Sequence, residues 1–177
     1  MKRLLALSVF TLFIFSSCLK NDSKCGYSDS TIVAPNAERQ ALGDSLDKYG
    51  ITNATMDASG FYYTIENPGT GRSVSNLCSN ILVTYKGSFF DGRVFDSTQI
   101  NSTVNPPSPI PASFQLGRVI TGWQKGIPLL KVGGDINLYI PPSLGYGAVD
   151  VPDPRTNQVV IPKNSYLVFK VHVIDIQ

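Results

Sequence analysis

The chain has 177 residues, of which 42% are hydrophobic and 16% charged, and these proportions fit one globular domain with a short extension. Its formal net charge of +2 comes from Lys2 and Arg3, because the 15 basic residues less these two leave 13, which balance 13 acidic ones. A neutral chain without a basic cluster gives no reason to expect nucleic acid as a partner.

Residues 1–17 have the pattern of a signal peptide. Lys2 and Arg3 are followed by an apolar run that ends at Phe15 and is too short to span a bilayer well. Two small residues then precede Cys18, which resembles the bacterial lipobox, where the Cys is lipidated and becomes the mature N-terminus. Phe15 stands where an aliphatic residue is usual, and the alternative is an ordinary secretory signal. The lipobox predicts a bacterial envelope protein, held to a membrane by lipid alone.

The cysteines after Cys18 leave two possibilities open. An exported protein can form disulfides, so Cys25 and Cys78 could pair and tie the N-terminal arm to the domain. Two unpaired thiols are the alternative, because connectivity cannot be read from sequence. Residues 18–31 are polar, and we expect them to form a flexible tether after the lipidated Cys18.

Residues 32–59 form an N-terminal extension with one short helix. The helix is predicted over Asn36–Tyr49, with Asn36 as N-cap and Gly50 as the stop. An apolar stripe near helical period supports it: Ala37, Ala41, Leu42, Leu46 and Tyr49.

The domain proper is expected over residues 60–177 and begins with a strand, Gly60–Ile65, closed by the turn Asn67-Pro68-Gly69. Residues 82–97 then read as two strands joined at Asp91-Gly92. Asp-Gly between apolar runs predicts a tight hairpin turn of the primed type, with positive φ at both central residues.

Asp96 follows Phe95 on the second of these strands. A carboxylate beside a buried aromatic needs a hydrogen-bond partner, and Tyr85 on the preceding strand is a candidate. The alternative is a solvated Asp at the start of a loop.

The rest of the chain alternates strands with long loops. Ser97–Ser113 holds four prolines and is predicted to be a surface loop, and so is Ser143–Pro162. Between them we expect a strand at Phe114–Leu116, a helix at Thr121–Val132 that ends at Gly133-Gly134, and a strand at Ile136–Ile140. The helix carries Trp123, Ile127 and Leu130 on one face, although Pro128 removes one backbone hydrogen bond.

The last strand is predicted over Tyr166–Ile176. Its inner face consists of Leu167, Phe169, Val171 and Val173. His172, the only histidine, falls on the opposite face beside Lys170 and is interpreted as a solvated strand residue rather than a ligand.

The inventory of reactive side chains argues against most enzyme classes. With one His, no Ser-His-Asp set can be assembled, and no Cys/His cluster has zinc spacing. There is no phosphate-binding Gly loop and no pair of carboxylates in an apolar setting. The chain is therefore expected to need no metal or cofactor, and a reaction that breaks no covalent bond fits it better than hydrolysis, group transfer or redox chemistry.

An ordered set of motifs between Gly60 and Gln177 resembles the FKBP-type peptidyl-prolyl cis-trans isomerases. The motifs are Val83-Thr84-Tyr85-Lys86-Gly87, Asp91-Gly92, Val94-Phe95-Asp96-Ser97, Phe114-Gln115-Leu116-Gly117, Val119-Ile120-Thr121-Gly122-Trp123, Leu144-Gly145-Tyr146-Gly147 and Tyr166-Leu167-Val168-Phe169. The predicted elements and the resemblance imply the same α+β fold, a twisted antiparallel β-sheet wrapped around a short central helix. In the family, helical extensions can build dimers, but this one is too short, so a monomer is expected.

The resemblance also implies a site. Its catalytic residues would be Tyr85, Phe95, Asp96 and Tyr146, and its substrate-binding residues Phe114, Val119, Ile120, Trp123, Ile161 and Phe169. Trp123 would be the floor beneath the proline ring, the Ile120 N–H and the Tyr146 hydroxyl would hold substrate carbonyls, and Asp96 would orient Tyr85.

The implied ligands are proline-containing polypeptides and macrolide inhibitors. Two departures from the family pattern flank the expected pocket: Ala112 replaces a frequent aromatic, and the loop after Tyr146 is longer and lacks a common His. The runner-up function is a non-catalytic peptide-binding or chaperone module with the same fold.

Overall fold

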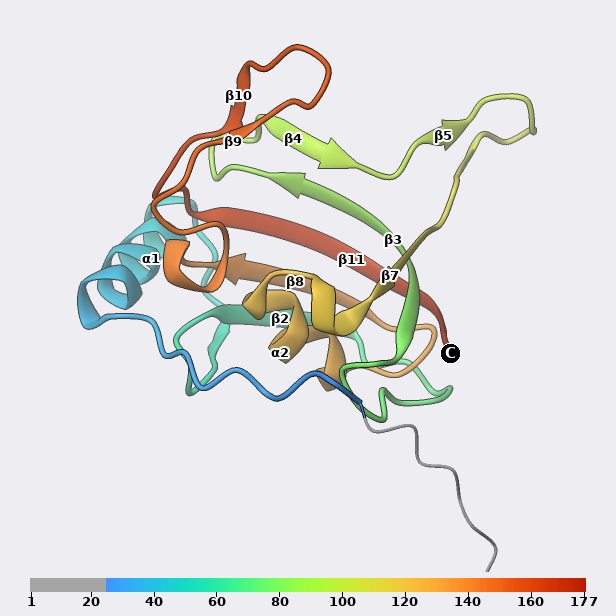
Figure 1. The fold of residues 1–177 in the computed structure, drawn as a ribbon, viewed down its shortest axis with the longest axis horizontal. Coiled ribbons are helices and arrows are strands. Elements are labelled where there is room, and N and C mark those ends of the chain that lie inside the picture. Colours follow the sequence, from blue (N-terminus) through green and yellow to red (C-terminus); the bar gives the residue numbers. More distant parts are fainter. Residues whose placement is uncertain (1–24) are drawn as a thin grey trace, which may run out of the picture.

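A seven-stranded antiparallel sheet forms the body of the molecule (Figure 1). The computed structural model describes residues 25–177. The strand order is β1-β2-β8-β11-β3-β4, and β7 pairs with the opposite end of β3 from β4. The strands are β1 (Thr55–Met56), β2 (Tyr62–Asn67), β3 (Asn80–Ser88), β4 (Val94–Ser97), β7 (Ala112–Gln115), β8 (Asp135–Ile140) and β11 (Leu167–Ile176). This confirms the predicted antiparallel sheet.

The concave face of the sheet holds the main core. Alternate residues of β11 point inward, as predicted, and all four are at least 96% buried: Leu167, Phe169, Val171 and Val173. Helix α2 (Thr121–Gly126) packs on this face through Trp123, followed by Ile127. The short helix therefore lies in the curve of the sheet, where it was expected.

The helical segment is shorter than the predicted Thr121–Val132. Helix α2 ends at Gly126, and a 3₁₀ turn, η2 (Ile127–Leu129), follows. Pro128 lies in the first turn of η2, where its missing N–H costs least. Leu130 then adopts an extended conformation, so the helix prediction was wrong from Leu130 to Val132.

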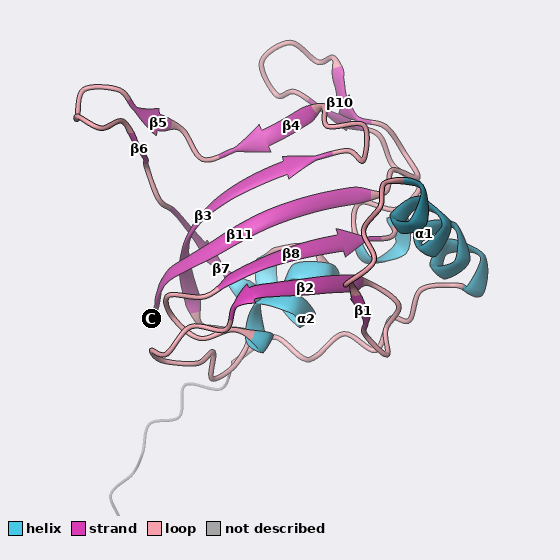
Figure 2. Cartoon of the chain, turned by 180° about the vertical axis from the view of Figure 1, so that it is seen from behind, coloured by secondary structure: helices cyan, strands magenta, loops and turns pink. Residues whose placement is uncertain are grey.

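Helix α1 (Asn36–Lys48) covers the opposite, convex face at one end of the sheet (Figure 2). Leu42 and Leu46 pack against Tyr139 in a second, smaller core. The N-cap is Pro35 rather than Asn36, which is the first helical residue and makes no capping bond. Gly50 ends the helix with φ of 68°, as predicted.

The β3–β4 hairpin corrects the turn prediction. The Gly92 N–H donates to Phe89 O (3.0 Å) and the Phe89 N–H to Arg93 O (2.9 Å), which closes a three-residue loop. Only Gly92 has positive φ (86°), whereas the primed turn required it at Asp91 too. The loop is a type I-like turn followed by a left-handed glycine, the next commonest hairpin solution.

The two predicted loops contain short strands. The segment Ser97–Ser113 projects as an arm whose strands β5 (Ile100–Asn101) and β6 (Ser108–Pro109) pair with each other (Figure 1). Ser143–Pro162 includes the end of a 3₁₀ turn, η3 (Pro142–Leu144), and a hairpin of β9 (Val151–Pro152) and β10 (Val159–Ile161).

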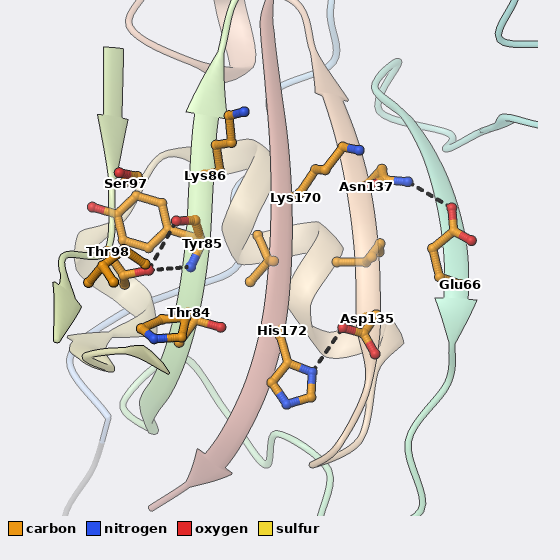
Figure 3. Close-up of a pocket in the computed structure, with 14 residues that line it drawn as sticks. Glu66, Thr84, Tyr85, Lys86, Ser97, Thr98, Asp135, Asn137, Lys170 and His172 are labelled. Atoms are coloured by element: carbon orange, nitrogen blue, oxygen red, sulfur yellow. Dashed lines mark hydrogen bonds and ion pairs between the residues drawn. The ribbon is translucent and has the colours of Figure 1, made fainter. Parts of the chain in front are cut away.

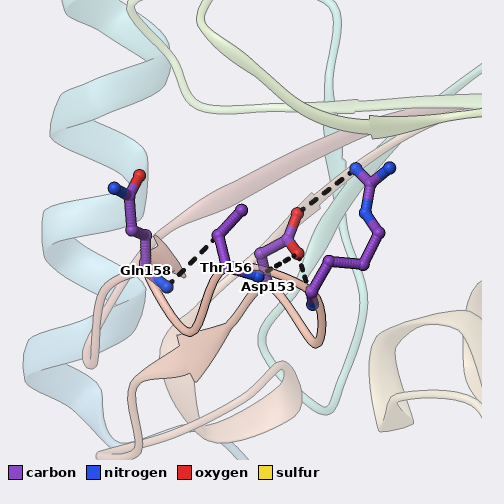
Figure 4. A network of polar contacts seen from close by, with 4 residues as sticks. Asp153, Thr156 and Gln158 are labelled. Atoms are coloured by element: carbon purple, nitrogen blue, oxygen red, sulfur yellow. Dashed lines mark hydrogen bonds and ion pairs between the residues drawn. The ribbon is translucent and has the colours of Figure 1, made fainter.

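Asp153 organises the β9–β10 turn (Figure 4). Its carboxylate accepts the N–H groups of Arg155 (2.7 Å) and Thr156 (3.1 Å) and pairs with the Arg155 guanidinium (3.6 Å). These backbone hydrogen bonds, more than the guanidinium charge, lower the pKa of Asp153. The loop is therefore held by its own polar contacts.

The N-terminal arm is joined to the domain by a disulfide between Cys25 and Cys78, which selects one of the two alternatives for these cysteines. From Cys25 the arm runs past α2 to α1 (Figure 1). Tyr27 packs against the main core, so residues 25–31 differ from the expected flexible tether. The predicted signal peptide of residues 1–17 and the lipidation at Cys18 lie outside the described residues. Within residues 25–177, no helix has the length and apolar character needed to cross a bilayer.

Candidate functional site

A cavity of about 240 Å³ lies between the concave face of the sheet and the start of α2. Four strands, the 3₁₀ turn η1 (Leu116–Arg118), the N-terminal part of α2 with the two residues before it, and the loop after η3 contribute its lining: Tyr85, Asp96, Phe114, Arg118, Val119, Ile120, Trp123, Tyr146 and Phe169. Eight of the ten predicted site residues are thus brought together, from positions up to 84 residues apart in the chain.

Trp123 is the central aromatic side chain of this cavity. Its ring meets Phe169, Tyr85 and Phe114 edge to face, at centroid distances of 5.3, 5.4 and 6.0 Å. The side chain is 4% exposed, and its indole N–H has no acceptor within the described residues. The backbone N–H of Trp123 donates to Ile120 O at 2.9 Å, which fixes the backbone that carries the ring at the start of α2.

The polar wall is built from Tyr85 and Asp96. The Tyr85 hydroxyl donates to Asp96 Oδ2 at 2.6 Å, which confirms the predicted partner. Burial, and next this contact with Asp96, raise the pKa of Tyr85 well above its usual value. Tyr85 therefore stays a neutral hydrogen-bond donor at physiological pH.

A register shift in β4 explains how Asp96 reaches the cavity. Gly87 pairs with Asp96 while Ser88 pairs with Val94, so Phe95 is an extra residue in the ladder. Such a bulge re-aims side chains that would otherwise alternate between the two faces. As a result Asp96 binds Tyr85, and the neighbouring Phe95 also contacts the concave face.

One backbone donor and one side-chain donor on the rim of the cavity have no hydrogen-bond partner. Within residues 25–177, neither the Ile120 N–H nor the Tyr146 hydroxyl makes a hydrogen bond. Burial first, and then the charge of Asp96, raise the pKa of Tyr146, so this hydroxyl also stays protonated. Both groups can donate to a carbonyl that enters the cavity.

Phe95 and Ile161 are not among the residues that line the cavity, which differs from the expectation for both. The Phe95 ring backs Phe169 edge to face at 5.5 Å, and Ile161 is 4% exposed within the main core. Arg118 also lines the cavity, although no motif predicted it as a site residue. A single basic residue before the Val119-Ile120 pair forms no pattern that could have marked it.

A larger groove lies on the convex face and has a different character (Figure 3). It encloses about 750 Å³ beside the β5–β6 arm and is lined mainly by polar and charged side chains. His172 lies there, as predicted for an outer-face residue, but its Nδ1 pairs with Asp135 Oδ1 at 2.9 Å. Because Tyr85 and His172 are the only aromatic rings among its lining residues, this groove lacks the aromatic cluster of the smaller cavity and is not the candidate site.

Residues 73–174 match the family model of the FKBP-type peptidyl-prolyl cis-trans isomerases. The chain belongs to this family. The matched range contains every residue that lines the cavity, so the cavity lies within the part of the chain that the family model covers.

Several curated proteins are similar to this chain, and two of the three described here carry the family's name. The FkpA isomerase of Buchnera aphidicola subsp. Schizaphis graminum is 38% identical over 120 residues, which cover 68% of this chain and 42% of the relative. The Escherichia coli K12 FkpA is 36% identical over 143 residues, 80% of this chain and 47% of the relative. The outer membrane protein MIP of Legionella longbeachae is 34% identical, over 79% of this chain and 55% of the relative. The chain thus spans about half the length of the curated relatives it matches.

Solved structures agree with the family fold. The crystal structure of Escherichia coli FkpA superposes with a TM-score of 0.56 at 30% identity, covering 80% of this chain and 63% of that one. A peptidyl-prolyl isomerase from Pseudomonas syringae pv. tomato gives a TM-score of 0.62 at 26% identity, covering 84% of this chain and 99% of that one.

Proposed function

We propose that the chain is a peptidyl-prolyl cis-trans isomerase that binds proline-containing polypeptides in the aromatic cavity. The observation that carries this proposal is the cavity itself: aromatic rings around Trp123, with two unpaired donors, the Ile120 N–H and the Tyr146 hydroxyl, on its rim. Membership of the family supports the same activity.

The chemistry asked of such a cavity is modest. Rotation about the peptide bond loses amide resonance and meets a barrier of about 18–20 kcal/mol. Water solvates the charge-separated resonance form, so moving the amide into a dry aromatic cavity eases rotation. Tighter binding of the twisted amide than of either planar form lowers the barrier further. No covalent bond changes, and no proton is transferred.

The proposed roles are those that the family resemblance implies, and the positions of the side chains support them. The proline ring rests on Trp123, between Phe114 and Phe169. The Ile120 N–H and Tyr146 hydroxyl hold substrate carbonyls, and Asp96 holds Tyr85 toward the twisting amide. Phe95 contacts Phe169 edge to face, so its expected catalytic role would be exerted through that ring.

A proline-switched peptide assay tests this proposal. The mature protein should accelerate cis-to-trans exchange, which takes tens to hundreds of seconds uncatalysed. Tyr146→Phe should lower kcat/KM, because one carbonyl donor is lost while the ring is kept. Binding of the peptide without any acceleration would refute the isomerase and establish the non-catalytic peptide-binding or chaperone module instead.

The proposal also covers the location, assembly and inhibitors of the protein. We place it in the bacterial cell envelope, anchored through a lipidated Cys18 and monomeric, with macrolides as inhibitors of the aromatic cavity. The lipobox-like sequence before Cys18 supports the anchor, and one relative is named an outer membrane protein. Mass spectrometry should find a diacylglyceryl-cysteine at the mature N-terminus, and an unmodified N-terminus beyond Cys18 would refute the anchor. Light scattering tests the monomer, and competition with a macrolide tests the inhibitor.

A further inference from the structure

Arg118 is the only basic residue among the side chains that line the aromatic cavity. It forms no ion pair with any of the described residues, and its side chain is open to solvent. Its Nε donates to the Tyr27 hydroxyl at 2.9 Å. Since this bond uses the Nε, both terminal nitrogens of the guanidinium are left to bind a planar anion such as a carboxylate.

Tyr27 is itself held in place from several sides. Its hydroxyl donates to Gln115 Oε1 at 3.2 Å. Its ring covers the backbone of Gly117 so closely that a Cβ there would lie 2.4 Å from the ring. Only glycine at position 117 leaves room for this contact, so the Tyr27 ring packs directly on the residue that precedes Arg118.

The disulfide and two hydrogen bonds fix the segments that carry Tyr27 and Arg118. Cys25 lies two residues from Tyr27 and is bonded to Cys78. The Gly117 N–H donates to Leu77 O at 2.7 Å, which ties the segment before Arg118 to the residue before Cys78. On the other side, Gln124 of α2 donates to Val119 O at 2.8 Å. The segment that carries Arg118 is thus fixed on both flanks.

We infer that Arg118 forms a subsite for a carboxylate, so that the cavity prefers polypeptides with Asp or Glu next to the proline, and that Tyr27 positions Arg118 for this contact. The inference rests on the proposed function, because it concerns the substrates of the same cavity. Holding the guanidinium before substrate arrives lowers the entropy lost on binding. Arg118 touches the substrate, whereas Tyr27 acts only through it.

The test uses peptides that differ in one residue beside the proline. Glu, Ala and Lys are placed directly before the proline in one series and directly after it in another. We expect kcat/KM to be about three- to fivefold higher for Glu than for Lys in at least one series, the size typical of a solvent-exposed ion pair. The difference should lie in KM and shrink as salt is added.

Three variants separate charge recognition from structure. Arg118→Gln should bring the Glu-to-Lys ratio close to one. Tyr27→Phe keeps the ring over Gly117 but removes the hydroxyl, and should reduce the ratio by about half through a higher KM for the Glu peptide. Arg72→Gln removes the same charge from a residue that does not line the cavity and pairs with Asp175, so it should leave the ratio unchanged.

Binding measured without catalysis keeps this inference separate from the proposed function. Trp123 is the only tryptophan and lies in the cavity, so its fluorescence reports peptide binding directly. Acceleration of all peptides with equal efficiency would overturn the Arg118 subsite and leave the isomerase intact. Tighter binding of Glu peptides, lost in Arg118→Gln but without acceleration, would support the subsite and refute the isomerase. A Glu preference that persists in Arg118→Gln would also overturn the subsite.

Discussion

Tyr85 and Tyr146 set the pH range in which the cavity keeps its polar groups. Burial and the neighbouring Asp96 raise the pKa of both hydroxyls above the usual value of about 10. The neutral forms therefore persist through neutrality, and we expect kcat/KM to be nearly flat between about pH 6 and 8. Because the folded state binds these protons more tightly than the unfolded state, their contribution to stability is complete below about pH 10 and is lost only as the pH rises through the raised values.

A pH–rate profile checks the expectation for kcat/KM. The expectation for stability is checked by urea unfolding: the free energy of unfolding should fall above about pH 10, and should fall less steeply in Tyr85→Phe. A bell-shaped profile with two limbs between about pH 6 and 8 would indicate general acid–base catalysis and contradict the desolvation mechanism.

Trp123 combines structural and binding roles that substitutions can separate. Trp123→Ala should lower the free energy of unfolding by about 3–5 kcal/mol, because it empties the centre of an aromatic cluster. Trp123→Leu fills more of the space and should unfold closer to the wild type, while peptide affinity falls. The two readouts are urea unfolding and kcat/KM. Full activity in Trp123→Leu would mean that the floor of the pocket lies elsewhere.

Gly87 allows the aromatic wall to form. A Cβ at this position would lie 2.6 Å from the Phe95 ring and 2.8 Å from the Phe169 ring. Gly87→Ala should therefore displace both rings, cost about 1–3 kcal/mol of stability and reduce activity. Gly26→Ala is the matched control, since nothing lies within 4 Å of its Cβ. Equal melting temperatures for the two variants would contradict this account.

The place of a single residue in the site could be predicted where a sequence motif determines it, but not where the packing of the core determines it. The Tyr85–Asp96 contact followed from a charge next to an apolar strand. Phe95 contacts Phe169 and Ile161 is buried in the main core, so neither lines the cavity, and alternation along a strand does not reveal such packing. Arg118 was missed because a lone basic residue carries no pattern.

At the scale of elements, the disulfide makes the N-terminal arm part of the domain. It closes a loop of 53 residues, for which chain entropy predicts about 4 kcal/mol of stabilisation. Replacing both Cys25 and Cys78 by Ser should lower the free energy of unfolding by this amount. Urea unfolding of both proteins would measure it, in a Cys18→Ser background so that no third thiol exchanges. An unchanged midpoint would show that noncovalent contacts alone hold the arm.

Element types were predicted better than element lengths. Strands β2, β3, β8 and β11 were found because their apolar alternation is long. Strands β5, β6, β9 and β10 have only two or three residues each, lie in loop-like segments rich in proline or glycine, and were read as loops, since so few residues show no period. The hairpin turn was misjudged because Asp-Gly fits both a two-residue loop and a three-residue loop with glycine last.

The whole molecule has two cores on opposite faces of one sheet. Leu46→Ala in the convex-face core should cost about 2–5 kcal/mol of stability, because the side chain is 3% exposed. It should leave kcat/KM unchanged well below the unfolding temperature, since α1 does not line the cavity. Leu129→Ala, at a side chain 39% exposed, is the control for stability. A parallel loss of activity in Leu46→Ala would show that the two cores are coupled.

The architecture of the whole molecule could be predicted because ordered motifs and strand periodicity agreed. The position of α1 could not, since its apolar stripe says only that one face is buried. It docks on the convex side because β8 and its neighbours present Tyr139, Tyr62 and Val168 there, residues that the sequence left unassigned.

The disulfide also has a consequence for the reach of the anchored protein. If Cys18 carries the lipid, the covalent path to the folded body stops at Cys25, seven residues on, and spans at most about 25 Å when fully extended. A compact domain of this length has a diameter of about 35 Å, so the protein would work within one molecular width of the bilayer. Its clients would be chains that pass close to the membrane surface, and the bond between two cysteines would set that working distance.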